Sequence, residues 1–435
     1  MKDKIKILII PSDTMGVGHF RSIWPAQSME RDYSDKVDVE INHQPNIENI
    51  EYLTSFDIIH FHRHIGPYEG SAELFPKIQA AGTILVMDID DFWEPPSTHP
   101  LYEVVKKERL SEKISGNLKL VDYVTTTTEV FAEQIRQFNK NVFVIPNALN
   151  MEHKMWVSES QENPTDRCRI SWIGGSSHLH DLELMKPGFQ RLWGNSELKD
   201  KFQIIMCGFD TRGSITEMTP EGQGRTRPIK PHETVWLKFE EFFTSNHKGA
   251  ENDPEYYKWL SKIKKPKSSD YKDAQYEKDY VRRWTLPLTQ YGRHYDYCDV
   301  CLAPLIDTWI EKKEHKKPDG RVSVQEIKRR HVFNEVKSEL KIIEAGMKKK
   351  VLIAQDFGIY KELIEDGKTG LLVKNDQKDW YKHMKRVIED PEYRAELAEN
   401  LHEFVKDKYE ITGVTGDRIK IYEQIMEKVK SKELA

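Results

Sequence analysis

Short apolar runs alternate with amphipathic stretches along the first third of the chain. The apolar runs lie at residues 4–11, 56–62, 83–87, 123–126 and 142–145. Between them, the spacing of apolar residues predicts helices at 16–29, 70–80, 101–118 and 129–138. Strands that are apolar on both faces and are separated by helices are typical of a parallel, doubly wound α/β sheet.

A second series of the same kind follows a polar, irregular stretch at residues 147–166. Its apolar runs lie at 169–173, 202–206, 300–303, 351–354 and 371–373. We therefore expect two Rossmann-like domains, over residues 1–150 and 166–410. Apolar residues at helical spacing predict a further helix within 411–435; they are Ile419, Ile421, Tyr422, Ile425, Met426 and Val429.

Two segments interrupt the second series, near residues 208–267 and 307–330. The first is polar and contains one helical run, WLKFEEFF. The second has eight Lys or Arg and four Asp or Glu between 311 and 330, a local net charge of +4 in a chain of net charge −5. A mobile, solvated loop is the plain interpretation. The alternative is a lid over an anionic ligand, or a contact for an anionic partner such as nucleic acid.

Composition narrows the class of protein. With 435 residues, 38% hydrophobic and 31% charged, the chain is typical of a globular enzyme and not of a disordered protein. It contains no apolar run near the ~18 residues of a membrane span, and MKDKIKILII leads into a strand, so we expect a cytoplasmic protein. Its four cysteines make no disulfide framework. Cys298 and Cys301 form C-x-x-C inside an apparent strand, where alternation would separate them onto opposite faces, which argues against zinc.

Polar residues and glycines gather where the predicted strands of the first domain end. In an open parallel sheet, ligands bind beyond the carboxyl ends of the strands. The residues at these ends are Gly16, Gly18, His19, Arg21, Arg63, His64, Gly66, Asp88, Asp90, Asp91 and Asn147. We expect this set to share one rim of the sheet. The two leading glycines either allow close backbone approach to a ligand or merely let a strand turn into a helix.

The stretch 334–360, followed by DGKTGLLV, predicts a helix, a turn at Gly346, a buried strand, a loop and a second short strand. Asn334 or Ser338 is the expected cap of the helix. Glu344 lies in its last turn, where the helix macrodipole disfavours a carboxylate. Glu344 is therefore either a hydrogen-bond acceptor for a ligand hydroxyl or a solvated charge.

This pattern resembles the nucleotide-sugar half of GT-B glycosyltransferases, above all the retaining family-four (group 1) type. The resemblance is specific around 170–182 and 297–373, and it extends to PNAL at 146–149. It implies two Rossmann-like domains facing a cleft, with the C-terminal helix crossing back to the first domain. Glu344 matches the Glu that holds the donor's ribose. The family's earlier Glu, which contacts the donor sugar, falls at Val336, so this part of the motif is missing.

The resemblance implies a nucleoside-diphosphate sugar as co-substrate, for which we take UDP as the working nucleotide, with no cofactor and no metal. The expected donor-binding residues are Gly16, Gly18, Gly174, Gly175, Arg282, Arg283, Lys337, Ser338, Glu344, Asp356, Gly358, Ile359 and Tyr360. The expected base-binding residues are Gly208, Phe209, Pro304 and Leu305. Many family members place an Arg and a Lys shortly after the strand at 169–173, whereas His178, His180 and Asp181 stand there in this chain. Candidates for the missing positive charge are Lys337, Arg282, Arg283 and Lys341.

The expected catalytic residues are His62, His64, Asp90, Asp91 and Lys337. The histidines of HFHRH share a strand face, so they form either a metal site or polar contacts to the sugar or the acceptor, and we favour the contacts. The aspartates of DIDD bind acceptor hydroxyls or act as a base. Their alternatives are a cap for the following turn, or a D-x-D metal site of the kind that GT-A glycosyltransferases use.

The predicted reaction is transfer of a sugar to an acceptor hydroxyl, and the resemblance implies retention of configuration at the anomeric carbon. A sugar-nucleotide epimerase or phosphorylase with the same fold is an alternative. A noncatalytic protein that binds sugars or nucleic acid is another alternative, and Val336 in place of the family's sugar-contacting Glu favours it. A saccharide or a lipid-linked sugar is the expected acceptor, ahead of a modified DNA base.

Overall fold

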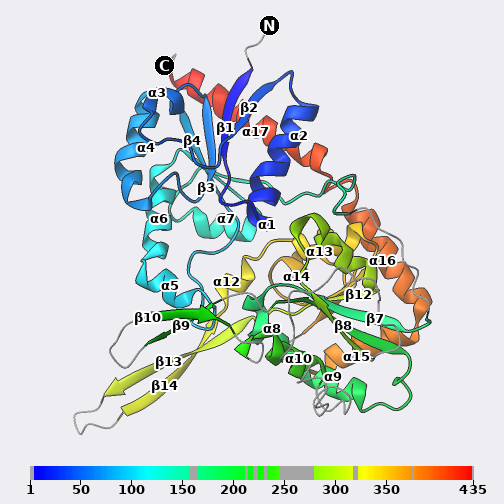
Figure 1. The fold of residues 1–435 in the computed structure, drawn as a ribbon. Coiled ribbons are helices and arrows are strands. Elements are labelled where there is room, and N and C mark those ends of the chain that lie inside the picture. The colour runs from blue at the N-terminus through cyan, green and yellow to red at the C-terminus, as the bar shows by residue number, and fades with distance from the viewer. Residues whose placement is uncertain are drawn as a thin grey trace.

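The computed structural model describes residues 4–156, 165–210, 214–218, 224–229, 233–244, 279–316, 322–374 and 377–433. They form two domains, stacked one above the other in Figure 1, and each domain is built around a six-stranded sheet. Every described strand pair within these two sheets is parallel. The predicted fold class, two Rossmann-like α/β domains, is confirmed.

The first sheet has the strand order β2-β1-β3-β4-β5-β6. Its strands are β1 (Ile5–Ile10), β2 (Val37–Ile41), β3 (Ile58–His62), β4 (Ile84–Ile89), β5 (Tyr123–Thr126) and β6 (Val142–Val144). Its helices are α1 (Gly16–Gly18), η1 (His19–Ile23), α2 (Trp24–Asp32), α3 (Ile50–Leu53), η2 (Tyr68–Gly70), α4 (Ser71–Ala80), α5 (Tyr102–Lys107), α6 (Leu110–Leu120) and α7 (Glu129–Ile135). The single helix predicted at 101–118 is two helices, because Arg109 between them has a left-handed backbone, with φ of 51°.

The second sheet has the strand order β11-β8-β7-β12-β15-β16. Its strands are β7 (Cys168–Ile173), β8 (Phe202–Phe209), β11 (Tyr280–Trp284), β12 (Val300–Ala303), β15 (Val351–Gln355) and β16 (Leu371–Val373). Its helices are η3 (Ser176–His178), α8 (Leu179–Glu183), α9 (Lys186–Trp193), α10 (Trp236–Thr244), η6 (Leu288–Tyr297), α12 (Val332–Glu335), α13 (Leu340–Met347), α14 (Gly358–Leu363), α15 (Gln377–Glu389) and α16 (Pro391–Val405). The apolar runs named above became strands within two residues of their predicted limits, except that β8 ends three residues later than predicted. Strands β2 and β11 were not predicted.

Helix α17 (Ile411–Glu433) leaves the second domain and lies along the first, as Figure 1 shows. Its Ile419, Tyr422 and Ile425 are buried in one core cluster with residues of β1 and α2. The predicted apolar stripe is therefore what fixes the helix on the first domain. Burying large apolar side chains contributes about 1.5–3 kcal/mol each, so this contact holds the two domains together.

Both segments that interrupt the second domain contain antiparallel ribbons. The strands β9 (Ser214–Met218) and β10 (Gly224–Pro228) form one, and β13 (Thr308–Lys316) and β14 (Val322–Arg330) form the other. The interpretation of 307–330 as a mobile loop is therefore wrong. Successive side chains of this segment alternate between the two faces of the ribbon, as in any strand, although many of these side chains are charged.

Two local predictions are wrong. The helix predicted from Asn334 is divided into α12 and α13; His331 caps α12, Asn334 lies inside it, and Glu339 is the N-cap residue of α13. The left-handed turn after α13 falls on Lys349, with φ of 52°, and not on Gly346.

The cysteine pair was also placed wrongly. Strand β12 begins at Val300, so Cys298 lies before the strand and its sulfur sits 3.7 Å from that of Cys301. All four cysteines of the chain are buried free thiols. Within the described residues, no helix is long and apolar enough to cross a membrane.

Candidate functional site

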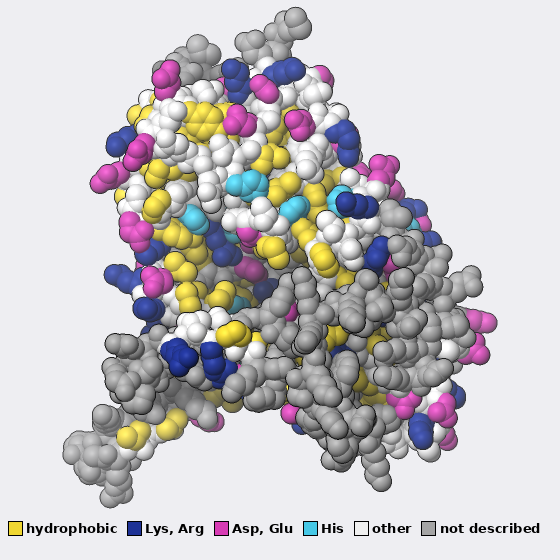
Figure 2. Space-filling view, in the orientation of Figure 1, with side chains coloured by type: hydrophobic (Ala, Val, Ile, Leu, Met, Phe, Trp, Pro, Cys, Tyr) yellow, Lys and Arg dark blue, Asp and Glu magenta, His cyan; other side chains and the backbone are white. Residues whose placement is uncertain are grey.

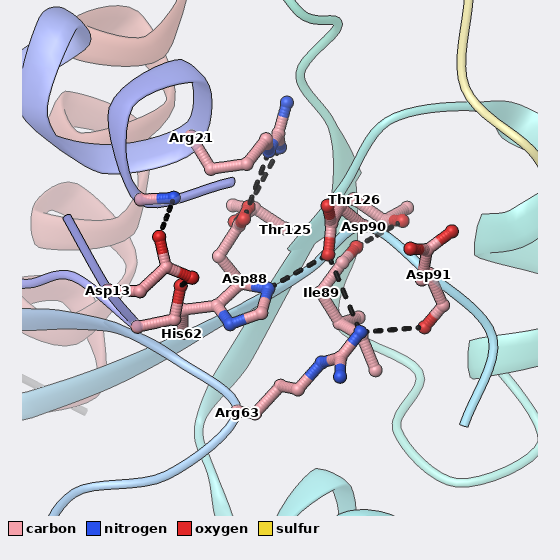
Figure 3. A network of polar contacts seen from close by, with 12 residues as sticks. Asp13, Arg21, His62, Arg63, Asp88, Ile89, Asp90, Asp91, Thr125 and Thr126 are labelled. Carbon is pink, nitrogen blue, oxygen red and sulfur yellow. Dashed lines mark hydrogen bonds and ion pairs between the residues drawn. The ribbon is translucent and has the colours of Figure 1, made fainter. Parts of the chain in front are cut away.

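A buried ion pair organises the rim of the first domain. Arg21 of η1 and Asp88 at the end of β4 are 1% and 0% exposed, and two hydrogen bonds of 2.8 and 3.0 Å join them (Figure 3). Burial raises the pKa of Asp88, but the charge and hydrogen bonds of Arg21 outweigh burial, so that pKa lies far below its usual range. Asp88 is therefore a structural anion and not a proton acceptor.

Arg21 also joins this rim to the segment that leads into the second domain. Its Nη1 donates to the backbone oxygen of Ile145 at 2.8 Å and to Oδ1 of Asn147 at 3.4 Å. On the other side of the pair, Thr125 donates to Asp88 at 2.6 Å. The predicted rim residues Arg21, Asp88 and Asn147 thus do meet, as the parallel sheet requires.

His60 has different hydrogen-bond partners from His62. It is buried, its Nδ1 bonds the hydroxyl of Tyr422 on α17, and its Nε2 lies 3.3 Å from Thr125 Oγ1. Burial lowers the pKa of His60 to about 3, so it stays neutral. Its role is to fasten α17 to the sheet.

His62 forms a close pair with Asp90. Its Nε2 lies 2.9 Å from Asp90 Oδ1, and Arg63 Nη2 lies 3.6 Å from the same oxygen (Figure 3). Burial raises the pKa of Asp90, but the hydrogen bond from His62 and the charges of His62 and Arg63 hold it at about 2. His62 Nδ1 is buried and bonds no described residue. The pair therefore presents an oriented imidazole with one ring nitrogen still to be satisfied.

The residues flanking this pair differ in setting. Arg63 has a left-handed backbone with φ of 61°, which is uncommon for a residue other than glycine. Its guanidinium donates to the backbone oxygen of Asp91 at 3.4 Å. His64 Nδ1 lies 2.7 Å from the backbone oxygen of Gly66.

The glycine loop after β1 has one sterically required glycine. A Cβ on Gly18 would lie 1.9 Å from the backbone oxygen of Asp13, whereas a Cβ on Gly16 would meet nothing within 4 Å. Asp13 Oδ1 accepts hydrogen bonds from the backbone of Met15 at 2.7 Å and Gly18 at 3.1 Å. Gly18 therefore serves the turn, and Gly16 leaves open space beside it.

Glu344 of α13 is the central group of the second domain. Its side chain is buried, and Oε2 accepts hydrogen bonds from the hydroxyls of Tyr295 at 2.5 Å and Tyr291 at 3.3 Å. Burial raises the pKa of Glu344. The prediction that Glu344 is something other than a solvated charge fits this setting. Sequence reasoning missed both tyrosines, because they lie about fifty positions upstream in η6.

Lys341, one turn earlier in α13, interacts electrostatically with this carboxylate. Burial lowers its pKa, and the charge of Glu344 opposes that effect. Its Nζ donates to the backbone oxygen of Ile173, the last residue of β7, directly before Gly174 and Gly175. Lys341 therefore lies at the glycine turn where a diphosphate was expected.

That turn is tightly packed. Gly208 has a φ of +100°, and a Cβ on it would lie 2.9 Å from the backbone oxygen of Gly174. Gly175 has open space, with nothing within 4 Å of an added Cβ. Phe209 and Leu305, both expected at the nucleotide base, are core residues with at most 2% exposed. Pro304 between these strand ends is buried as well.

The two arginines of β11 are engaged elsewhere. Arg282 donates to Glu240 at 2.6 Å and lies 3.9 Å above the ring of Phe209. Arg283 is 6% exposed and lies 3.3 Å above the ring of Tyr297. A role for either in holding phosphate stays a prediction, and it would require rearrangement of these contacts.

The segment between α12 and α13 spans the two domains. Lys337 Nζ lies 2.8 Å from Asp91 Oδ1 and 4.4 Å above the ring of Phe333. Val336, which replaces the family's sugar-contacting Glu, is 1% exposed and packs in the core cluster of the first domain. The departure from the motif thus has a physical reason, because an apolar residue is needed at this interdomain contact. Ser338 beside it is half-buried.

Glu339 is a site residue that sequence reasoning missed. It is 1% exposed, and its Oε1 accepts a hydrogen bond from the backbone of Asn147 at 2.5 Å across the domain boundary. Its Oε2 is buried and bonds no described residue. Burial raises the pKa of Glu339 to about 7.

Two further contacts shape the rim of the second domain. Asp181, buried, accepts from the backbone of Ile306 and from Asn334 Nδ2, both at 2.8 Å. Gly358 has φ of +52°, and a Cβ there would lie 2.7 Å from the backbone oxygen of Glu335, so glycine is required. The expected donor loop is thereby held against α12, with Ile359 and Tyr360 buried behind it and Asp356 bonded through its backbone to β16.

Each aspartate of the DIDD run that lies at this rim is paired with a different basic side chain. Asp88 pairs with Arg21, Asp90 with His62 and Asp91 with Lys337. Among the described residues, no group of three or more His, Cys, Asp or Glu is arranged to hold a metal ion. Figure 2 shows basic, acidic and imidazole side chains gathered in the hollow between the upper and lower domains.

Comparison with known proteins agrees with this arrangement. Residues 340–404 match the family model described as Glycosyl transferases group 1, and this segment contains Glu344. HepE from Anabaena, solved with UDP, is 12% identical with a TM-score of 0.55, covering 99% of this chain and 100% of that one. Sucrose-phosphate synthase from Thermosynechococcus elongatus is 13% identical with a TM-score of 0.57, covering 98% and 100%.

A protein from Listeria monocytogenes described as a UDP-N-acetylglucosamine 2-epimerase also has this fold, at 10% identity and a TM-score of 0.50, covering 98% of each chain. No curated protein matches the sequence significantly. The family match over residues 340–404 and the shared fold agree with the resemblance seen in the sequence, and the chain has the GT-B fold.

Proposed function

We propose that this protein transfers a sugar from a nucleoside-diphosphate sugar to a hydroxyl of a saccharide or lipid-linked acceptor, with retention and without a metal or cofactor. The observation that carries the proposal is the setting of Glu344. It lies in the segment that matches the family model, it is buried, and two tyrosine hydroxyls orient its carboxylate. A carboxylate held in this way is suited to accept hydrogen bonds from the ribose hydroxyls of the donor.

UDP is the nucleotide we expect, since HepE was solved with UDP and with UDP-glucose. The diphosphate would lie at the turn of Gly174 and Gly175, where Lys341 supplies positive charge next to the backbone of Ile173. Lys337 would approach from the interdomain segment, exchanging Asp91 for a phosphate oxygen. Positive charge at this point stabilises the departing diphosphate, which is the principal electrostatic demand of the reaction.

The acceptor would enter from the side of the first domain. Asp90 orients His62, whose remaining ring nitrogen can bond a sugar or acceptor hydroxyl. In a retaining transfer, the acceptor oxygen forms a bond to the anomeric carbon on the face that the diphosphate leaves. The acceptor's proton passes to the departing diphosphate oxygen. His62 and Asp90 therefore act in positioning the reactants, and they need not take up that proton.

A screen of sugar nucleotides with saccharide and lipid-linked acceptors tests the proposal. We expect release of UDP that requires an acceptor, persists in a chelator, and is lost in Glu344→Ala. NMR of the product would show the anomeric configuration of the donor. Isomerised sugar nucleotide formed from the donor alone would instead identify an epimerase. Nucleotide binding with no turnover in any acceptor pool would identify a noncatalytic protein.

A further inference from the structure

The ribbon of β13 and β14 projects from the second domain, away from both sheets (Figure 1). It begins at the functional rim. His331 donates its backbone N–H to Asp307 O at 2.8 Å, which closes the base of the ribbon directly before α12. A two-stranded ribbon alone in water is only marginally stable. Most of the ribbon side chains whose exposure the structure describes are exposed, so within the described residues the ribbon is largely uncovered by the body of the protein.

The two faces of the ribbon differ. Residues directly opposite each other in the ladder share a face. On one face, Glu311 pairs with Arg329 at 3.0 Å and with Lys313 at 3.7 Å, and His315 Nε2 lies 3.2 Å from Gln325 Oε1. This face pairs these polar groups with one another, and its two apolar residues, Trp309 and Ile327, are half-buried. We therefore take it as the face that stays in water.

The opposite face carries aliphatic side chains. Ile310, Val322 and Val324 are 56%, 50% and 52% exposed. The register puts Ile310 opposite Lys328, and Thr308 opposite Arg330, so these cations belong to the same face. Glu326 is also exposed there, opposite position 312. Figure 2 shows hydrophobic side chains on the projecting ribbon.

We propose that this face of the ribbon docks on an anionic membrane surface. The segment 311–330 has a net charge of +4 in a chain of net charge −5, so its charge is opposite to that of the rest of the molecule and complementary to acidic lipid headgroups. Aliphatic side chains among cations suit the interface between headgroups and acyl chains, where the apolar groups are buried and the cations remain at the headgroups.

A second copy of the chain fits this face less well. Nine residues span about 30 Å, and the ribbon is about 10 Å wide, so each face offers roughly 300 Å². Two such faces would bury about 600 Å², well below the ~1,200 Å² of a stable interface. Nucleic acid also fits less well, because single strands stack on aromatic side chains and duplexes are bound through phosphate contacts, and neither uses three exposed aliphatic side chains.

Docking in this way would place the site near the bilayer. The ribbon's base adjoins α12 and the segment that carries Lys337, and Arg330 at its end pairs with Glu335 of α12. The inference deepens the proposed function, since it favours a lipid-linked acceptor over a free saccharide. The binding itself does not depend on that function, because it is measured without any donor or acceptor.

Flotation of the full-length protein with phospholipid vesicles tests the inference. We expect binding to vesicles of phosphatidylglycerol and phosphatidylcholine, and little binding to phosphatidylcholine alone. The triple variant I310T/V322T/V324T keeps β-branched side chains and so keeps strand propensity, while it removes apolar contact. It should lower partitioning by about tenfold or more. Lys328→Gln should lower partitioning by about fivefold, and the effect should shrink in high salt.

The control is S323T/Q325T, which also introduces threonine into β14 but on the polar face, and it should leave partitioning unchanged. A circular dichroism spectrum equal to that of the natural protein shows that each variant is folded. Equal loss in the control variant, or no binding to acidic vesicles at low salt, would overturn the inference. So would preferential binding to duplex DNA that the threonine variant retains, or association of copies that the threonine variant abolishes. Vesicle binding without sugar transfer would leave the inference standing and count against the proposed function.

Discussion

Replacing Glu344 by Ala removes the group that we assign to the donor's ribose. An ionised carboxylate has about four acceptor positions. Tyr295 and Tyr291 occupy positions on Oε2, which leaves acceptor capacity for ribose hydroxyls. A hydrogen bond to a charged group contributes about 1.5–3 kcal/mol. Losing one or two of them should cost about 3 kcal/mol, which corresponds to a Kd for UDP raised by roughly a hundredfold.

Isothermal titration with UDP measures this directly. Two variants separate binding from folding. Glu344→Gln keeps the volume and an oxygen for Tyr295, so it should fold as the natural protein does and bind UDP with intermediate affinity. Glu399→Ala removes an exposed carboxylate that pairs with Lys349 on the surface, and it should leave the Kd unchanged.

The reasoning is refuted if folded Glu344→Ala binds UDP with the Kd of the natural protein. A fall in affinity that is equal in Glu399→Ala would show a general loss of structure instead. Burial has already raised the pKa of Glu344, so removal of this carboxylate also relieves a desolvation cost. The free energy of unfolding of Glu344→Ala should therefore change by less than its free energy of UDP binding does.

Three more substitutions test other parts of the account. Arg21→Leu leaves Asp88 as an unpaired buried charge, so it should lower the free energy of unfolding by about 3–5 kcal/mol in urea titrations. The control Arg31→Leu breaks an exposed pair with Asp32 and should lower that free energy by less than about 1 kcal/mol. Glu339 has its pKa raised to about 7 from 4.5, so the folded state holds its proton more tightly and stability falls as pH rises through this range. Glu339→Gln should remove that slope, a gain of up to about 3 kcal/mol above pH 7 in denaturation curves, and an unchanged slope would contradict the assignment. His62→Gln should lower the rate of sugar transfer by about a hundredfold or more while the Kd for UDP stays constant; a matching loss of UDP affinity would place His62 on the donor side.

Ten of the twelve strands in the two sheets could be predicted, because each of their apolar runs is long enough for one buried strand. The edge strands β2 and β11 were missed, because polar residues interrupt their apolar positions. Glu344 could be singled out because the macrodipole disfavours a carboxylate in the last turn of a helix, and the structure shows that this carboxylate is buried and hydrogen-bonded. The cysteine pair was misplaced because the apolar run before β12 extends beyond the strand itself, and the boundary of a strand depends on its neighbours. The ribbon was taken for a loop because its many charges hid the alternation of Ile310, Val322 and Val324.

The contacts within the site could not be predicted, because they join residues far apart in the chain. Arg21 and Asp88 are 67 positions apart, and Asn147 and Glu339 are 192 apart. Spacing along one element carries no signal for such pairs. Val336 shows a further limit: the sequence reveals that a motif residue is missing, and only the packing against the first domain explains why.

A crystal structure of the protein with UDP tests the central claim most directly. The account predicts the nucleotide against the second domain, with ribose hydroxyls on Glu344 and the diphosphate beside Gly174, Gly175 and Lys341. The terminal phosphate, to which the sugar of the donor would be attached, would face His62 of the first domain. Nucleotide bound away from α13, or seated on the first domain, would contradict the account.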